Sequence, residues 1–232
     1  MPSGLLRTAL HLRPPYRLHQ IYEQLLGTEV EVQVVADRRQ QAERAEVAAL
    51  EELERLSRIL NRFDPHSELR RWLTRPGERV RLSPDLLSVL QQADRWRLLS
   101  GGAFHPGADA LGALWQRAQE QDRLPEPEQL RAQVGALADP LWTFHSDSSV
   151  TLHATYPLGL NALAKGLIVD RMVEAARACG GVRAVLVNAG GDLRTSGGQG
   201  TEVLLSDPRT RYDNALPLLG RARSRPGGPR AG

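Results

Sequence analysis

The strongest constraint on the fold is a strand pattern followed at once by a long helix pattern. Residues 28–36 alternate between valine and polar side chains, which is the period of a strand with one wet face. Residues 38–60 then carry an apolar helical stripe made of Ala49, Leu50, Leu53, Leu56 and Leu60. A second helix pattern over residues 162–179 leads into a buried strand at residues 182–187, so helices and strands alternate along the chain.

Shorter elements lie between these two units. Ser83 and Pro84 predict a helix start, and the glycine pair at residues 101–102 predicts its end. We expect its buried side to contain Leu86, Leu87, Leu90, Ala93 and Trp96. Residues 119–135 predict a surface loop or short helix. A hairpin is expected at 142–152 and a further strand at 203–206.

Composition excludes several classes of protein. No apolar run approaches the roughly 18–20 residues that cross a bilayer, and residues 1–17 carry no secretory signal pattern. The single cysteine, Cys179, rules out an internal disulfide, so we expect a cytoplasmic location.

The net charge of +3 is unevenly distributed along the chain, because residues 209–232 hold six arginines and one aspartate. That segment could touch nucleic acid, but it lacks interleaved aromatic residues, so we favour a solvated tail and expect no nucleic-acid partner.

Lys165 is the first candidate for ligand binding. It is the only lysine among thirty lysines and arginines, and it lies near the start of the predicted helix 162–179. Backbone N–H groups at a helix start bind phosphate oxygens, and a compact ammonium adds a point charge. An ordinary amphipathic helix with a surface lysine remains the alternative.

Two glycine-rich segments are the other candidates. Residues 188–192 (Asn-Ala-Gly-Gly-Asp) follow the buried strand, and paired glycines let a ligand or a backbone approach closely. Residues 101–106 (Gly-Gly-Ala-Phe-His-Pro) could place an aromatic wall beside a flat ring. A tight turn explains residues 188–192 equally well, and a helix C-cap explains residues 101–106 equally well.

These segments together resemble the ApbE family of FAD:protein FMN transferases. The similarity lies in the order of five motifs over roughly residues 22–215: the Gly-Thr pair at 27–28, the segment 63–69, the glycine-rich loop 101–106, the Ala-Lys-Gly sequence at 164–166 and the turn 188–192. The resemblance implies a T-fold-like α+β core, with a mixed or antiparallel sheet packed against helices. It also implies magnesium-dependent transfer of FMN from FAD to a Thr or Ser hydroxyl of an acceptor flavoprotein.

The resemblance also implies roles for individual residues. Those expected to bind FAD are Leu26, Phe63, Ala103, Phe104, His105 and Lys165. The backbone carbonyl of Ala162 is expected to bind Mg²⁺. His105 stands where the family usually has aspartate, and Gly159 where many members have aspartate. No catalytic residue is assigned.

The last part of the family pattern has no counterpart in this sequence. Its missing segments supply the side-chain magnesium ligands and further core strands, so we expect an incomplete domain. We divide the chain into an extension at 1–20, the ApbE-like domain at 21–215 and a basic disordered tail at 216–232. The alternative function is a flavin-binding remnant without transfer activity.

Overall fold

The computed structural model describes residues 14–197, 204–206 and 215–217. The strands are β1 (Tyr16–Leu25), β2 (Thr28–Ala36), β3 (Arg79–Arg81), β4 (Trp142–Phe144), β5 (Ser149–Leu152), β6 (Val182–Ala189), β7 (Asp192–Gly197), β8 (Leu204–Ser206) and β9 (Ala215–Pro217). The helices are α1 (Arg39–Leu60), α2 (Glu68–Leu73), α3 (Pro84–Leu99), α4 (Ala108–Glu120), α5 (Pro127–Leu137) and α6 (Asn161–Ala178).

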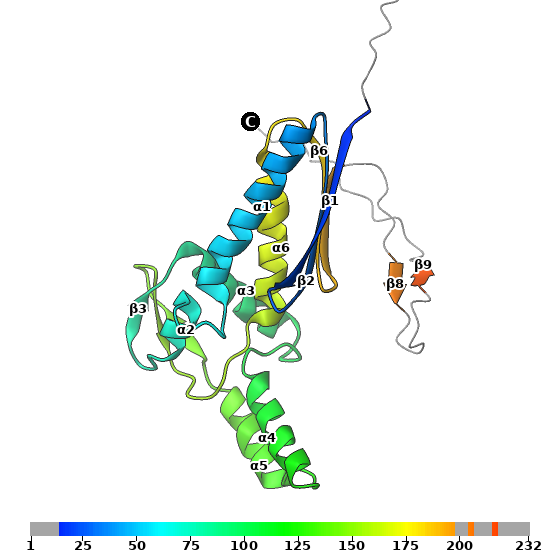
Figure 1. Cartoon of the computed structure of the whole chain (residues 1–232). Helices are drawn as coiled ribbons and strands as arrows, with labels where there is room; N and C mark the ends of the chain where they lie inside the picture. Colours follow the sequence, from blue (N-terminus) through cyan, green and yellow to red (C-terminus); the bar gives the residue numbers. More distant parts are fainter. Residues whose placement is uncertain (1–13, 198–203, 207–214, 218–232) are drawn as a thin grey trace, which may run out of the picture.

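The main sheet is four-stranded and fully antiparallel, in the order β1-β2-β6-β7. Helices α1 and α6 pack side by side against one face of it (Figure 1). The register pairs Val32 with Val187 and Val34 with Val185, and these side chains point into the layer between sheet and helices. Burial of such aliphatic side chains, each contributing about 1.5–3 kcal/mol, holds the two layers together.

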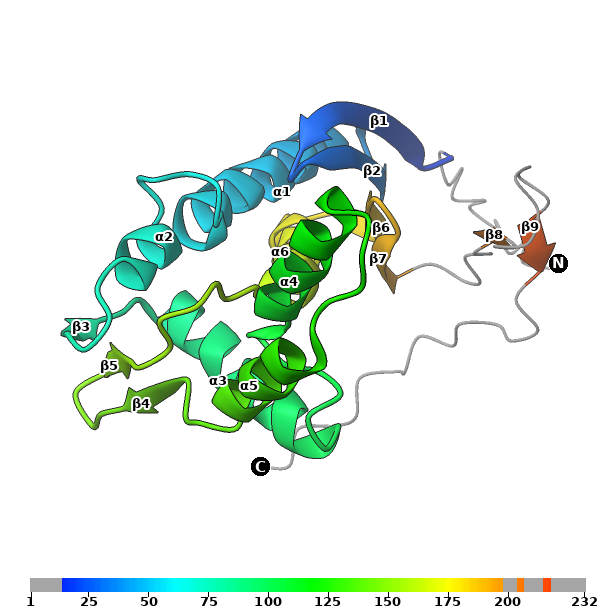
Figure 2. The same ribbon diagram turned by 90° about the horizontal axis from the view of Figure 1, so that it is seen from below.

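A second layer lies at the end of the main sheet where α1 finishes and α6 begins. It contains α2, α3 and a small antiparallel sheet in the order β3-β5-β4 (Figure 2). Helices α4 and α5 form a pair that projects away from this layer (Figure 1). Because α5 has no buried residue, this pair contributes little to the core.

The predicted α+β class and most predicted elements are confirmed. The helices expected at 38–60 and 162–179 are α1 and α6, and the expected hairpin is the β4–β5 pair. Trp96 is a correction, because its side chain is 49% exposed and only Leu86, Leu90 and Ala93 of the expected stripe are buried. The last turn of α3 extends past the core, which leaves Trp96 on the surface.

Strand β1 begins at Tyr16 and so crosses the boundary that we placed between residues 20 and 21. The basic segment 218–232 lies outside the described residues, so the predicted disorder of 216–232 stays a prediction. Of the helices described, none combines the length and apolar character needed to cross a bilayer.

Candidate functional site

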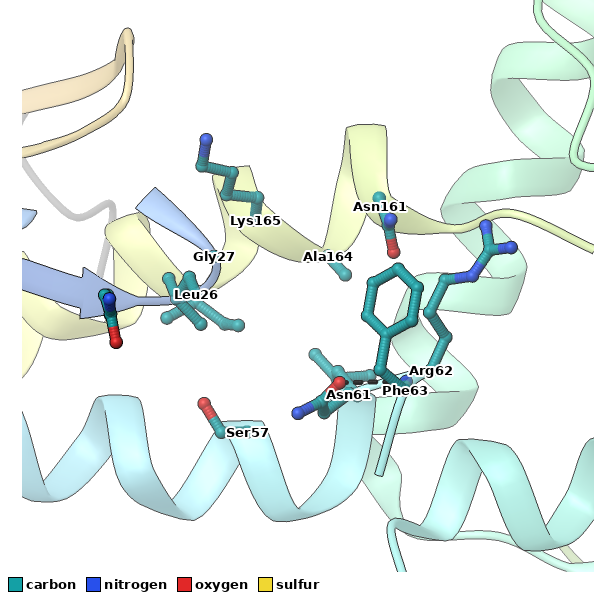
Figure 3. A pocket seen from close by; sticks show the side chains of 12 residues that line it. Leu26, Gly27, Ser57, Asn61, Arg62, Phe63, Asn161, Ala164 and Lys165 are labelled. Atoms are coloured by element: carbon teal, nitrogen blue, oxygen red, sulfur yellow. Dashed lines mark hydrogen bonds between the residues drawn. The ribbon is translucent and has the colours of Figure 1, made fainter. Parts of the chain in front are cut away.

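A cavity of about 440 Å³ lies where the β1–β2 turn, the end of α1 and the start of α6 meet (Figure 3). Its lining residues come from three distant parts of the chain: Gln24, Leu26, Gly27, Ser57, Leu60, Asn61, Arg62, Phe63, Asn161, Ala164, Lys165 and Ile168. Leu26, Phe63 and Lys165 were expected at one ligand site from sequence, and the fold brings them to this one cavity. We call it the first cavity.

The turn that presents Leu26 has an unusual backbone. Leu26 and Gly27 connect the paired residues Leu25 and Thr28, with φ angles of 53° and 72°. Two positive φ angles define the hairpin turn that fits the twist of antiparallel strands. Glycine adopts this conformation freely, but leucine does so at a cost of order 1 kcal/mol. The strained leucine places an apolar side chain in the cavity wall.

Lys165 and the glycine turn at residues 188–192 are in direct contact. The ammonium Nζ lies 3.5 Å from Oδ2 of Asp192, and the lysine side chain is 25% exposed. The turn is anchored because the Gly190 N–H donates to the Glu29 carbonyl at 3.1 Å. A Cβ atom on Gly190 would collide with Thr28 Oγ1 and approach Lys165 Nζ to 3.1 Å. Glycine at this position therefore lets the turn close over the lysine.

The start of α6 adds backbone donors to the same wall. Leu160, the N-cap, provides no side-chain cap, and its carbonyl accepts from Leu163 and Ala164. The N–H groups of Asn161 and Ala162 have no intrahelical acceptor, as at any helix N-terminus. Of these two residues only Asn161 lines the first cavity, and its N–H, with the helix dipole and Lys165, makes this side suited to an anion.

Phe63 forms the opposite side of the first cavity. Its ring is 78% exposed, and the Arg62 guanidinium carbon lies 5.2 Å from the ring centroid. The backbone N–H of Phe63 donates to Asn61 Oδ1 at 2.9 Å, which fixes the chain as it leaves α1. Arg62 also pairs with Asp109 of α4. An exposed aromatic face beside Leu26 is a suitable surface for a flat ring.

The loop residues Ala103, Phe104 and His105 do not line the first cavity. His105 binds within the protein instead: its Nε2 lies 2.9 Å from the Leu137 carbonyl, and its Nδ1 accepts from the Gly107 N–H at 3.0 Å. This arrangement requires the neutral ring with the proton on Nε2. His105 therefore connects the glycine-rich loop to the end of α5, and its contact with a flavin stays a prediction.

The burial of His105 predicts a pH-dependent stability. Desolvation of the ring lowers the pKa of His105 below its usual value of 6.5. The backbone hydrogen bond to Leu137 opposes this shift and is the smaller effect. The unfolded chain therefore binds more protons below that pH, and stability falls as the pH drops. We expect the wild type to lose more thermal stability between pH 7.5 and 5.5 than His105→Gln does, measured by thermal denaturation. Equal losses would contradict this assignment.

The expected magnesium ligand, Ala162, lies in the first turn of α6 and does not line the first cavity. Within the described residues no group of three or more His, Cys, Asp or Glu side chains is placed to hold a metal ion. One backbone carbonyl is too few, because Mg²⁺ prefers about six oxygen ligands. The residues that the structure describes therefore provide no side-chain cluster that would hold Mg²⁺ by itself.

Several cavity residues were not singled out from the sequence. Ser57 and Asn61 come from the end of α1, Asn161 from the start of α6 and Gln24 from the bulged end of β1. They surround the cavity with hydroxyl and amide groups. Asn61 and Asn161 could have been found from the sequence, because each lies at the end of a predicted helix. Nothing in the local sequence marks Ser57.

Comparisons with known proteins identify relatives of this chain. Residues 26–223 match the model of the ApbE family. A FAD:protein FMN transferase of Chlamydia muridarum is 29% identical over 147 residues, which cover 61% of this chain and 45% of that protein. A second, from Rhodobacter capsulatus, is 29% identical over 140 residues, 57% of this chain and 26% of that protein. The matched parts span less than half of either relative.

Solved structures show the same fold. The flavin transferase ApbE from Vibrio cholerae superposes with a TM-score of 0.70 at 20% identity, over 88% of this chain and 68% of that one. The ApbE protein from Thermotoga maritima gives a TM-score of 0.69 at 25% identity, over 87% and 66%. The match of the family model over most of the sequence, together with the shared fold, leads to one conclusion: the chain belongs to the ApbE family.

Proposed function

We propose that the chain binds FAD in the first cavity and takes part in transferring FMN from FAD to an acceptor flavoprotein. One observation carries the proposal. Leu26, Phe63 and Lys165, which lie far apart in the sequence, line a single cavity that offers both apolar surface and an ammonium group. FAD needs both, because it combines a flat ring with a pyrophosphate.

Each side of the cavity has a role in this proposal. The flavin ring lies between Leu26 and Phe63, and the phosphates face Lys165 and the backbone N–H of Asn161 at the start of α6. Lys165 exchanges the Asp192 carboxylate, at 3.5 Å, for a phosphate oxygen. Neutralising the phosphates and positioning the phosphorus are the main contributions to phosphoryl transfer.

The finer parts of the reaction rest on the family resemblance. The hydroxyl of an acceptor Thr or Ser attacks the FMN phosphorus, and AMP leaves with the bridging oxygen. Among residues lining the first cavity, the ionisable side chains are Lys165 and Arg62, so none is suited to accept the hydroxyl proton. Magnesium dependence is part of the proposal, but no step is assigned to the ion. The cytoplasmic location also stays a prediction.

A transfer assay tests the proposed function. The full chain is incubated with FAD, Mg²⁺ and a purified flavoprotein acceptor, and the acceptor is weighed by mass spectrometry. We expect a gain equal to covalently attached FMN and loss of the gain when the acceptor residue is replaced by alanine. FAD binding without any transfer would contradict the proposed transferase activity.

The second candidate is a flavin-binding protein without transfer activity. It is favoured by the lack of a metal-binding cluster within residues 14–197 and by the lack of a base in the first cavity. This candidate predicts FAD binding of equal affinity with Mg²⁺ and with a chelator. The transferase predicts tighter binding with Mg²⁺, so titrating FAD under both conditions separates the two.

The strained turn gives a test of where the flavin ring lies. Replacing Leu26 with asparagine, which tolerates a positive φ, should raise the free energy of unfolding by roughly 0.5–1 kcal/mol. FAD binding should weaken by about tenfold, because the apolar wall is lost. Urea denaturation and flavin fluorescence measure the two effects. Unchanged FAD affinity would remove Leu26 from the proposed ring site.

A further inference from the structure

A second cavity, of about 310 Å³, adjoins the first and shares Arg62 with it. It lies between α2 and the loop that leads from β5 to α6. Its lining is Arg62, Arg70, Leu73, Pro76, Leu152, Ala154, Thr155, Tyr156, Pro157 and Leu158. Aliphatic side chains and two arginines therefore line the same cavity. The FAD site proposed above does not use this space.

Charge in the second cavity has one sign. No aspartate or glutamate lines either cavity, whereas Lys165, Arg62 and Arg70 do. Arg62 pairs with Asp109, but Arg70 forms no ion pair within residues 14–197. Neighbouring cations in a concave, partly apolar surface attract anions strongly. Arg70 is therefore available for an acidic ligand.

The loop on the far wall adds unpaired backbone groups. Residues 153–158 are neither helix nor strand, and the N–H groups of Thr155 and Tyr156 donate to no acceptor in the described part of the chain. The Tyr156 hydroxyl donates to the Ala136 carbonyl at 3.3 Å, which holds the ring in place. These N–H groups and the two guanidinium groups belong to residues that line one cavity, and such donors suit carboxylates and an extended peptide backbone.

We propose that the second cavity binds an acidic segment of the acceptor protein. This inference rests on the proposed function, because it names how the acceptor is held next to the FAD site. Arg62 and Arg70 bind carboxylates, and the aliphatic lining residues, such as Leu73 and Leu158, contact an apolar side chain of the same segment. The acceptor is thereby anchored while its hydroxyl group reaches the first cavity.

The other half of FAD is the competing occupant of the second cavity. Figure 3 shows Lys165 on the Leu26 side of the first cavity and Arg62 on the opposite side, next to Phe63. A dinucleotide with its flavin ring against Phe63 and its phosphates at Lys165 continues away from Arg62. The second cavity adjoins the ring end of that ligand, which favours a polypeptide.

Peptide binding to the full chain tests the inference. The probe is a short fluorescein-labelled peptide of glycine, serine and aspartate, compared by fluorescence polarisation with the same peptide carrying asparagine. We expect the aspartate peptide to bind roughly tenfold more tightly, and Arg70→Gln to remove most of that difference. Arg71→Gln is the matched control, because Arg71 is the next residue of α2 but does not line the cavity. It should change the affinity less than twofold.

Each contrary outcome is distinct. Equal affinity for both peptides, or equal losses in Arg70→Gln and Arg71→Gln, would show attraction to surface charge without a built site and overturn the inference. A loss of FAD affinity in Arg70→Gln would assign the second cavity to the nucleotide and overturn it as well. Peptide binding is measured with and without FAD, so a failure of FAD binding itself counts against the proposed function alone.

Discussion

Replacing Lys165 with alanine is expected to weaken FAD binding by roughly 10- to 150-fold. The ammonium is the one cation on the α6 side of the first cavity among the described residues, and a hydrogen bond to a charged group contributes about 1.5–3 kcal/mol. Asp192 then faces the phosphates without its partner, which adds repulsion to the loss of attraction. Titration of the full chain with FAD by calorimetry measures the change.

Two further variants separate charge from packing. Lys165→Met keeps an apolar side chain along the cavity wall and removes only the ammonium, so it should lose nearly as much affinity as alanine. Arg171→Ala removes a cation from the same helix, but Arg171 pairs with Glu174 at 2.9 Å and lies outside both cavities. It should bind FAD like the wild type. Wild-type affinity in Lys165→Met would mean that the phosphates lie elsewhere.

The sequence predicted the layered core because its elements have strong periodicity. Valine alternation in β2 and the apolar stripes of α1 and α6 follow directly from burial on one side, and the structure confirms them. Strand β1 was not predicted, since Leu18 is its one fully buried residue and an edge strand needs little apolar pattern. Helix α4 was missed for a similar reason: its buried residues are two alanines, Ala110 and Ala118.

The candidate site was predictable in its parts and not in its geometry. The family pattern pointed to Leu26, Phe63 and Lys165, and the antiparallel packing of α1 against α6 brings them to one cavity. The same packing adds Ser57, which no motif marks. His105 differs, because its ring binds Gly107 and Leu137 and does not line the first cavity, so its contact with a flavin stays a prediction. Such bonds depend on the position of α5, which sequence periodicity does not fix.

Gly190 contributes both to the stability of the fold and to the proposed FAD site. Its φ of +54° is left-handed, and a Cβ atom there would collide with Thr28 Oγ1. Gly190→Ala should lower the free energy of unfolding by about 2–4 kcal/mol, from backbone strain and overpacking together. FAD affinity should fall as well, because the displaced turn moves Asp192 and Lys165. Urea denaturation and FAD titration measure the two effects.

A matched glycine distinguishes the collision from the strain. Gly101 has a similar φ of +59° but no atom within 4 Å of an added Cβ, so Gly101→Ala should cost only about 1 kcal/mol. Adding Thr28→Ala to Gly190→Ala removes the colliding oxygen and should restore part of the lost stability. The double variant should therefore be more stable than the sum of the two single effects predicts. Equal costs for the two glycine variants, with no recovery in the double variant, would mean that the turn does not pack against Thr28. The glycine turn would then not be what holds Lys165 at the first cavity.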